Sequence, residues 1–219
     1  YVDEAQVMQR EQAIGKGGLM PGRDFAAAFS SLRPNDLVWN YVESNYLKGE
    51  EPPPFDLLYW NADSTNLPGP MFCYYLRNMY LENKLLIPGR LSVNGEPVDL
   101  GTVQAPTFIY ASREDHIVPW WSAYESVKLL KGDKVHFVLG ASGHIAGVIN
   151  PPAKKNRNYW ANSKAPATAD AWFDGAKEIA GSWWPDWTDW LKPLSGKKKA
   201  APKNYGNTKY KVLEKAPGS

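Results

Sequence analysis

Residues 107–119 read TFIYASREDHIVP, a short apolar run followed by a polar turn that carries Asp115. The first four residues are β-branched or aromatic, which is typical of a buried strand. Proline is favoured in the first turn of a helix, so Pro119 predicts that a helix follows over residues 120–130. The segment therefore predicts a strand, an acidic turn and a helix in that order.

A second strand and a histidine come next. Residues 135–139, VHFVL, predict the strand, and the glycine-rich loop at 140–143 leads from it to His144. An acid and a histidine that follow successive strands are typical of the late part of an α/β-hydrolase fold. In such a site a neutral histidine takes the proton of a Ser or Cys nucleophile, and a carboxylate on its other nitrogen fixes the tautomer. Asp115 and His144 are therefore candidates for two members of a catalytic triad.

Spacing alone leaves two other interpretations open. In the first, Asp115 caps the helix that follows it at 120–130. In the second, His144 is a loop histidine that is hydrogen-bonded to backbone. A nucleophile is also missing, because no Gly-x-Ser-x-Gly or Gly-x-Cys-x-Gly pattern occurs in the chain. The single cysteine, Cys73, has bulky neighbours and is predicted to be a buried, apolar packing residue.

The start of the chain suggests where that nucleophile belongs. The sequence begins at Tyr1, and its first hundred residues contain few runs with strand character, although a doubly wound core needs several strands before its acid. We therefore expect a C-terminal fragment of a longer enzyme, with the nucleophile upstream.

Composition excludes several classes of function. The formal net charge is only +2, from 25 basic and 23 acidic residues, which favours neither nucleic acid nor an anionic membrane surface. No apolar run approaches the length of a membrane span. One cysteine excludes an intrachain disulfide. The ten Trp and twelve Tyr suit a core, an interface or an apolar ligand surface equally.

The pattern along the chain predicts three regions. They are a helical, proline-rich cap or lid at 1–90, the C-terminal part of an α/β-hydrolase core at 91–195, and a basic, loosely ordered tail at 196–219. Asn94-Gly95 is a turn signal for a small hairpin. The remaining helices are expected at 24–32, at 36–47 with Asn35 as cap, at 71–85, at 169–179 and at 183–191.

Five segments carry a resemblance to a known family. They read FSSLRPNDLVWNY (29–41), NLPGP (66–70), SREDHIVPW (112–120), GASGHIAGVINPP (140–152) and GSWWPDW (181–187). In this order they closely resemble class I polyhydroxyalkanoate synthases, the enzymes of poly(3-hydroxybutyrate) synthesis, over nearly the whole chain. The resemblance implies an α/β-hydrolase core with an inserted cap and a Cys nucleophile on an elbow N-terminal to Tyr1.

The resemblance also implies a reaction. By motif position Asp115 is similar to the family's catalytic acid and His144 to its base. The family polymerises (R)-3-hydroxyacyl groups from coenzyme A thioesters and releases CoA, in the bacterial cytoplasm at the surface of polyester granules. It needs no metal or organic cofactor beyond the CoA of the substrate. A homodimer, the growing polyester and the granule surface are the implied partners.

Four further residues occupy positions at or beside the family's motifs, and one of them departs from the family. Trp60 and Tyr75 are candidates to line an acyl or polymer channel, and packing within the cap explains them equally well. His116 is expected to hold the acid loop. Met71 departs from the family, in which many members have Trp at this place.

Three functions compete on these grounds. The first is a synthase fragment that is inactive alone, and the second is an esterase, lipase or polyester depolymerase on the same fold. The third is a non-catalytic module for dimer or granule contact. The long motifs favour the first over the second, and the missing nucleophile keeps the third open for this chain.

Overall fold

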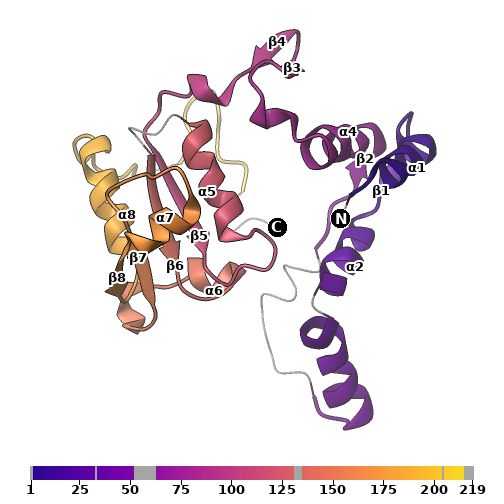
Figure 1. Cartoon of the computed structure of the whole chain (residues 1–219), viewed down its shortest axis with the longest axis horizontal. Helices are drawn as coiled ribbons and strands as arrows, with labels where there is room; N and C mark the ends of the chain where they lie inside the picture. The colour runs from indigo at the N-terminus through magenta and orange to yellow at the C-terminus, as the bar shows by residue number, and fades with distance from the viewer. Residues whose placement is uncertain (1, 33, 52–62, 131–134, 204, 215–219) are drawn as a thin grey trace. The chain divides into compact units, whose positions relative to one another are not determined.

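The computed structural model describes residues 2–32, 34–51, 63–130, 135–203 and 205–214. By their internal contacts these residues form two compact units, Tyr1–Val103 and Gln104–Ser219, here called unit 1 and unit 2 (Figure 1). The boundary expected at residue 91 lies earlier than this division. The small hairpin that follows residue 91 is grouped with unit 1, and the Gly89 N–H donates to the Val98 carbonyl at 2.9 Å.

Unit 1 is mostly helical in its described part. The Asp3 side chain caps the first helix by accepting a hydrogen bond from the Gln6 N–H at 2.8 Å. The helical segments are α1 (Glu4–Ile14), α2 (Gly22–Leu32), η1 (Asn35–Trp39), η2 (Val42–Leu47), α4 (Gly69–Tyr75), η3 (Leu76–Leu81) and η4 (Lys84–Leu86). Two short antiparallel pairs join β1 (Leu19–Met20) to β2 (Leu67–Pro68) and β3 (Leu91–Val93) to β4 (Glu96–Val98).

Two predicted helix limits in unit 1 are wrong. Asn35 is not a cap, because it already lies in the first turn of η1 behind Pro34, which makes no side-chain cap bond. The helix predicted over 71–85 begins at Gly69 and ends with η3 at Leu81, since Asn83 has a left-handed backbone with φ +44°. The segment 52–62 lies outside the described residues.

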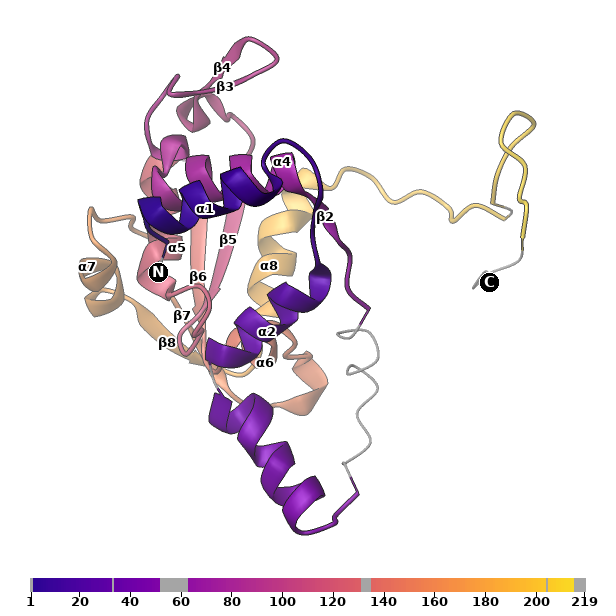
Figure 2. The ribbon, with the colours of Figure 1, turned by 90° about the vertical axis from the view of Figure 1, so that its right-hand side faces the viewer.

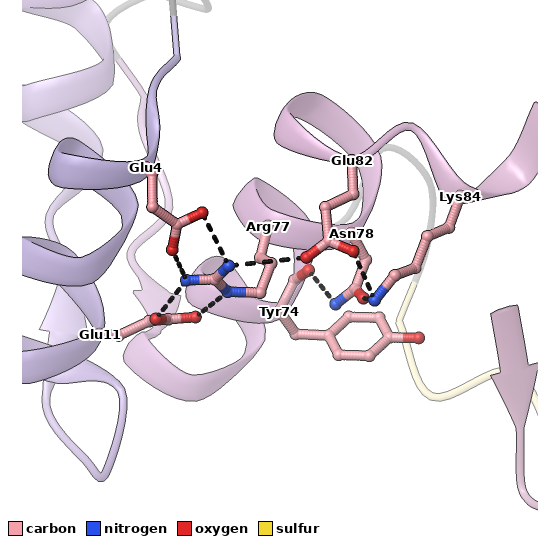
Figure 3. A network of polar contacts seen from close by, with 7 residues as sticks. All are labelled: Glu4, Glu11, Tyr74, Arg77, Asn78, Glu82 and Lys84. Atoms are coloured by element: carbon pink, nitrogen blue, oxygen red, sulfur yellow. Dashed lines mark hydrogen bonds and ion pairs between the residues drawn. The ribbon is translucent and has the colours of Figure 1, made fainter. Parts of the chain in front are cut away.

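Unit 1 is held by a small core and by one ionic network. Met20, Phe72 and Cys73 are buried together, and Phe25 meets Phe72 edge to face at 5.5 Å. Figure 3 shows Arg77 of η3 reaching two carboxylates of α1. Its Nε lies 2.6 Å from Glu11 Oε1, and its Nη2 lies 2.8 Å from Glu4 Oε1. The hydrogen bonds that Arg77 donates to Glu11 raise the pKa of Arg77 and lower the pKa of Glu11.

The predicted Asn-Gly hairpin is confirmed. Asn94 and Gly95 join β3 to β4 with φ values of +52° and +84°. A two-residue turn with positive φ at both positions matches the twist of the flanking strands, and Asn-Gly adopts it at low cost.

Unit 2 contains a four-stranded sheet in the order β5-β6-β7-β8. Strands β5 and β6 are parallel, and the other two pairs are antiparallel. Its elements are β5 (Thr107–Ser112), α5 (Trp120–Leu129), β6 (Val135–Gly140), α6 (His144–Val148), β7 (Asn158–Ala161), α7 (Ala169–Asp174), β8 (Lys177–Ala180) and α8 (Trp184–Leu191), with single helical turns at η6 (Pro152–Lys154) and η7 (Lys192–Leu194). A further single turn, η5 (Leu100–Thr102), lies at the end of unit 1. The predicted strands at 107 and 135 and the helices at 120 and 183 are confirmed.

The helix predicted over 169–179 is wrong in its second half. Helix α7 ends at Asp174, and the following residues form β8, which pairs along β7 with Lys177 opposite Ala161. The Asn162 amide closes the helix end by donating to the Trp172 carbonyl at 2.9 Å. Pairing with a distant strand thus overrides the helical pattern of the local sequence.

The two faces of the sheet in unit 2 are packed differently. Helices α5 and α7 contribute Tyr124 and Trp172 to the core on one face, where Phe137 lies between them. On the other face, Phe108 contacts Trp183, which precedes α8, and Trp190, which lies within α8. The ring centroid distances are 6.0 and 5.4 Å. Figure 2 shows α8 running beside the strands of unit 2.

The described residues beyond Leu194 contain no helix or strand. Within the ranges that the structure describes, no helix combines the length and the apolar character needed to span a bilayer.

Candidate active site

The acid and the histidine follow the carboxyl ends of two parallel neighbours. Strands β5 and β6 pair in register up to Ser112 opposite Gly140, so the loops that follow them start side by side. Asp115 lies in the first loop, and His144 is the first residue of α6 after the second. Asp115 Oδ2 lies 2.7 Å from His144 Nδ1. The structure thus brings together the two candidate triad residues, although 29 positions separate them in the chain.

Backbone hydrogen bonds hold the acid loop against the histidine loop. The Arg113 N–H donates to the Gly140 carbonyl at 2.8 Å, and the Glu114 N–H donates to the Ser142 carbonyl at 3.1 Å. The Arg113 guanidinium also lies over the Trp160 ring, 4.8 Å from its centroid. These contacts fix the distance between the two loops independently of the contact between the Asp115 and His144 side chains.

Asp115 uses its two carboxylate oxygens for different tasks. Oδ1 accepts hydrogen bonds from the Ile117 and Val118 N–H groups at 2.8 and 3.0 Å, and Oδ2 meets His144. The interpretation of Asp115 as a cap of the next helix is wrong, because α5 begins only at Trp120 and Pro119 caps it without a side-chain bond. The carboxylate instead stabilises its own turn and aims one oxygen at the imidazole.

The surroundings of Asp115 favour its ionised form. Burial by itself raises the pKa of this carboxyl, but the hydrogen bonds from the Val118 N–H, the His144 ring and the Ile117 N–H outweigh burial and lower the pKa below its ordinary value. Asp115 is therefore a carboxylate at neutral pH, and as an acceptor it pairs with a His144 Nδ1–H that donates a hydrogen bond. The tautomer of His144 that fits this contact carries its proton on Nδ1 and leaves Nε2 as the basic nitrogen.

His144 Nε2 makes no hydrogen bond to another described residue, and the His144 side chain is partly exposed. Its side chain is 44% exposed, whereas the Asp115 side chain is 9% exposed. A cavity of about 220 Å³ lies beside the pair, with Val118, Ala123 and Val148 in its wall. A second cavity in unit 2, of about 440 Å³ and between Tyr124 and Lys164, includes neither residue of the pair. Only the smaller of these two cavities has the candidate acid and base, Asp115 and His144, in its wall.

Two glycines leave room for the Tyr110 side chain, and one of them, Gly147, lets α6 lie close to β5. A Cβ at Gly147 would come within 3.0 Å of Ser112 Oγ and Tyr110 Oη, and a Cβ at Gly140 would come within 3.0 Å of Tyr110 Oη. The two hydroxyls lie 3.1 Å apart under the helix. Burial raises the pKa of Tyr110, so its phenol stays protonated. Our sequence reasoning missed Tyr110 and Ser112; their alternate positions on the strand that leads to Asp115 are the only signal that pointed to them.

The other sequence candidates lie elsewhere or lack contacts. Cys73 is buried in unit 1, and burial raises the pKa of its thiol, which agrees with the predicted packing role. Tyr75 is 49% exposed in unit 1 and meets Tyr80 edge to face at 5.5 Å. Trp60 lies outside the described residues, so the channel role of both aromatics stays a prediction. Met71 is an exposed residue of α4.

His116 does not hold the acid loop through a polar contact. Its side chain is exposed, and it makes no hydrogen bond or ion pair with another described residue. Asp115 and the backbone bonds of the turn perform that task. In the described ranges, no group of three or more His, Cys, Asp or Glu side chains is arranged to hold a metal ion.

Comparison with known proteins shows what this chain resembles over its length. A family model described as "alpha/beta hydrolase fold" matches residues 5–151. The chain is 58% identical over 223 residues to the poly(3-hydroxyalkanoate) polymerase subunit PhaC of Cupriavidus necator, which covers 100% of this chain and 38% of that protein. It is 43% identical to the subunit PhaC of Rhizobium meliloti and 42% identical to poly(3-hydroxyalkanoate) polymerase 2 of Ectopseudomonas oleovorans, each over 219 residues, with 35% and 39% of those proteins covered. The chain therefore spans between a third and two fifths of the length of these relatives.

Proposed function

This chain belongs to the α/β-hydrolase fold family, and on that premise we propose that it supplies the acid and the base of a polyester synthase. The proposed reaction joins (R)-3-hydroxyacyl groups of coenzyme A thioesters into a polyhydroxyalkanoate and releases CoA. The observation that carries the proposal is the contact of 2.7 Å between Asp115 and His144, within a chain that matches poly(3-hydroxyalkanoate) polymerases along its whole length.

The proposed mechanism uses the open nitrogen of His144. His144 Nε2 takes the proton of a Cys thiol, the thiolate attacks the thioester carbonyl, and CoA leaves as the thiol with that proton. The same base then takes the proton of a 3-hydroxyl, whose oxygen attacks the acyl-enzyme carbonyl and forms the ester bond, while the carbonyl–sulfur bond breaks and the Cys leaves as the thiol with that proton. Asp115 holds the Nδ1–H tautomer and stabilises the imidazolium in both steps.

We propose that the nucleophilic Cys belongs to a segment outside this chain. Cys73 does not suit the role, because it is buried and its thiol pKa is raised. No Gly-x-Cys-x-Gly or Gly-x-Ser-x-Gly pattern occurs in the sequence. We further propose that unit 1 forms part of a cap, that the whole protein acts as a homodimer on polyester granules in the cytoplasm, and that it needs no cofactor beyond the CoA of its substrate.

The test compares this chain with the longer protein that contains it. The chain alone is expected to release no CoA from (R)-3-hydroxybutyryl-CoA, whereas the longer protein releases CoA and forms polymer. His144→Gln in the longer protein lowers CoA release by on the order of 10²–10⁴-fold, because the general base is lost. His116→Gln is the matched control, since the neighbouring imidazole makes no polar contact with a described residue, and it retains activity within a few fold.

Each alternative function predicts a different product. Free 3-hydroxybutyrate without polymer would support the esterase or depolymerase. If the longer protein bound polymer and released no CoA, the result would support the interaction module. Full activity of His144→Gln would remove His144 as the base.

A further inference from the structure

The helix that carries His144 is too short to stabilise itself. Helix α6 has five residues, and the last four carbonyls of any α-helix lack partners within the helix. Helices of this length are not stable alone in water, since nucleation costs more than so few hydrogen bonds return. Something outside α6 must therefore hold its carbonyl end in place.

Three side chains from later in the chain donate to this end. The Trp184 indole N–H donates to the Val148 carbonyl at 3.0 Å, and the Trp183 indole N–H donates to the Gly147 carbonyl at 3.3 Å. Arg157 Nη1 donates to the Ala146 carbonyl and lies 3.4 Å from the Ile149 carbonyl. Four consecutive carbonyls, from Ala146 to Ile149, thus receive a side-chain N–H.

These donors are themselves fixed as a group. The Gly181 N–H donates to the Arg157 carbonyl at 2.8 Å, which ties the arginine to the segment that leads into the two tryptophans. The Trp183 ring packs on the Tyr110 ring of β5 at a centroid distance of 4.4 Å. The support for α6 is therefore anchored on the same strand that leads to Asp115.

We propose that Arg157, Trp183 and Trp184 are positioning residues for His144. They act through α6: by fixing its carbonyl end, they set where the helix begins and hold the imidazole Nδ1 on Asp115. Without them the end of α6 frays, the His144 backbone moves, and the contact of 2.7 Å loosens. The inference rests on the proposed function for its effect on catalysis, but its structural part does not.

The structural test reads the tautomers of the neutral histidines by two-bond ¹H–¹⁵N NMR of the rings. The chain has only three histidines, and their signals are assigned with His→Gln variants. His144 contacts Asp115 through Nδ1, whereas His136 contacts Asp186 through Nε2, also at 2.7 Å. The two pairs therefore predict opposite tautomers. Because Asp186 lies in α8, the His136 signal also reports whether α8 stays in place.

The variants separate the N–H donors from the rings. The double variant Trp183→Phe with Trp184→Phe retains aromatic rings but removes both donors, and Arg157→Leu removes the guanidinium. In both, His144 is expected to lose its Nδ1–H signature while His136 retains its own. Arg157→Lys restores a donor and should recover much of the His144 signature. Trp187→Phe is the matched control, because Trp187 packs against Trp183 at 6.5 Å and its indole makes no hydrogen bond to a described residue.

The longer protein gives the catalytic readout. The double tryptophan variant is expected to lower kcat for CoA release between about 10- and 100-fold with KM nearly unchanged, since substrate contacts remain and only the base is misplaced. An unchanged His144 tautomer in the double variant and in Arg157→Leu would overturn the proposal. So would the loss of both histidine signatures, because the donors would then maintain unit 2 as a whole rather than His144. If even the wild-type protein released no CoA, the proposed function would fail while the NMR result still decided the positioning role.

Discussion

Replacing Gly147 by alanine tests whether α6 lies on β5 as closely as the structure shows. In an ordinary helix this change stabilises by about 1 kcal/mol, because alanine has the higher helix propensity. Here the added Cβ would come within 3.0 Å of Ser112 Oγ, Tyr110 Oη and the Ala141 carbonyl. Ser112 is buried, at 2% exposure, so it has little room to move.

The expected net effect is a loss of stability. Overpacking a closely packed site costs about 1–3 kcal/mol. Separating the Tyr110 and Ser112 hydroxyls, which lie 3.1 Å apart, costs roughly 1 kcal/mol more. The propensity gain offsets about 1 kcal/mol, so we expect Gly147→Ala to lower the free energy of unfolding by about 1–3 kcal/mol.

Urea unfolding followed by tryptophan fluorescence measures this change, since most tryptophans of the chain lie in unit 2. Gly143→Ala is the matched control at the other end of the same helix. Gly143 has φ −86°, and the nearest atom to its added Cβ would be the Glu114 carbonyl oxygen at 3.8 Å. We expect that control to change stability by less than about 0.5 kcal/mol.

A double variant locates the clash. Ser112→Ala removes the hydroxyl oxygen nearest to the added methyl group, so in combination with Gly147→Ala it should recover about 1 kcal/mol as a coupling energy. If Gly147→Ala were as stable as the wild type, or more stable, the close approach of α6 to Tyr110 and Ser112 would be refuted.

Three further outcomes follow from the electrostatics and the burial of single residues. Because the pKa of Asp115 is lowered in the folded chain, its ionised form stabilises the fold above the unfolded pKa of about 4, and this contribution is lost as pH falls through the lower folded pKa. The difference in unfolding free energy between wild type and Asp115→Asn should therefore shrink between about pH 6 and about pH 3 in urea titrations, and a constant difference would contradict the assignment. Arg77→Met removes the ion pairs with Glu4 and Glu11; the loss in stability should be smaller in concentrated salt and at low pH, because the lowered pKa of Glu11 marks a contribution that disappears on protonation. Cys73 should resist iodoacetamide in the native chain and react fully in denaturant, as mass spectrometry would show; rapid native labelling would place the thiol at the surface.

Local patterns were sufficient for the segments around the candidate site. The strands at 107 and 135 and the helix at 120 were predicted within a residue or two, because each has a continuous apolar run or a proline that marks its boundary. The Asn94-Gly95 turn was equally local, since its positive φ values depend on those two residues themselves. The order of these elements was enough to place Asp115 and His144 on neighbouring loops.

Distant partners decided the elements that local patterns missed. Residues 177–179 were predicted to be helical, but they lie in β8, because their backbone groups pair with β7. The cap predicted at Asn35 failed for a local reason, since the helix starts one residue earlier than predicted and already includes Asn35.

The sequence by itself determined which side chains are the candidate acid and base and which strands precede their loops, because residue type and the order of the strands can be read directly from the chain. Only the tertiary structure decided how His144 is held. Arg157, Trp183 and Trp184 lie between 8 and 36 positions from the carbonyls that they bind, and no local periodicity marks such a contact. A short helix has too few hydrogen bonds of its own, so its position depends on donors that folding brings to it from elsewhere in the chain.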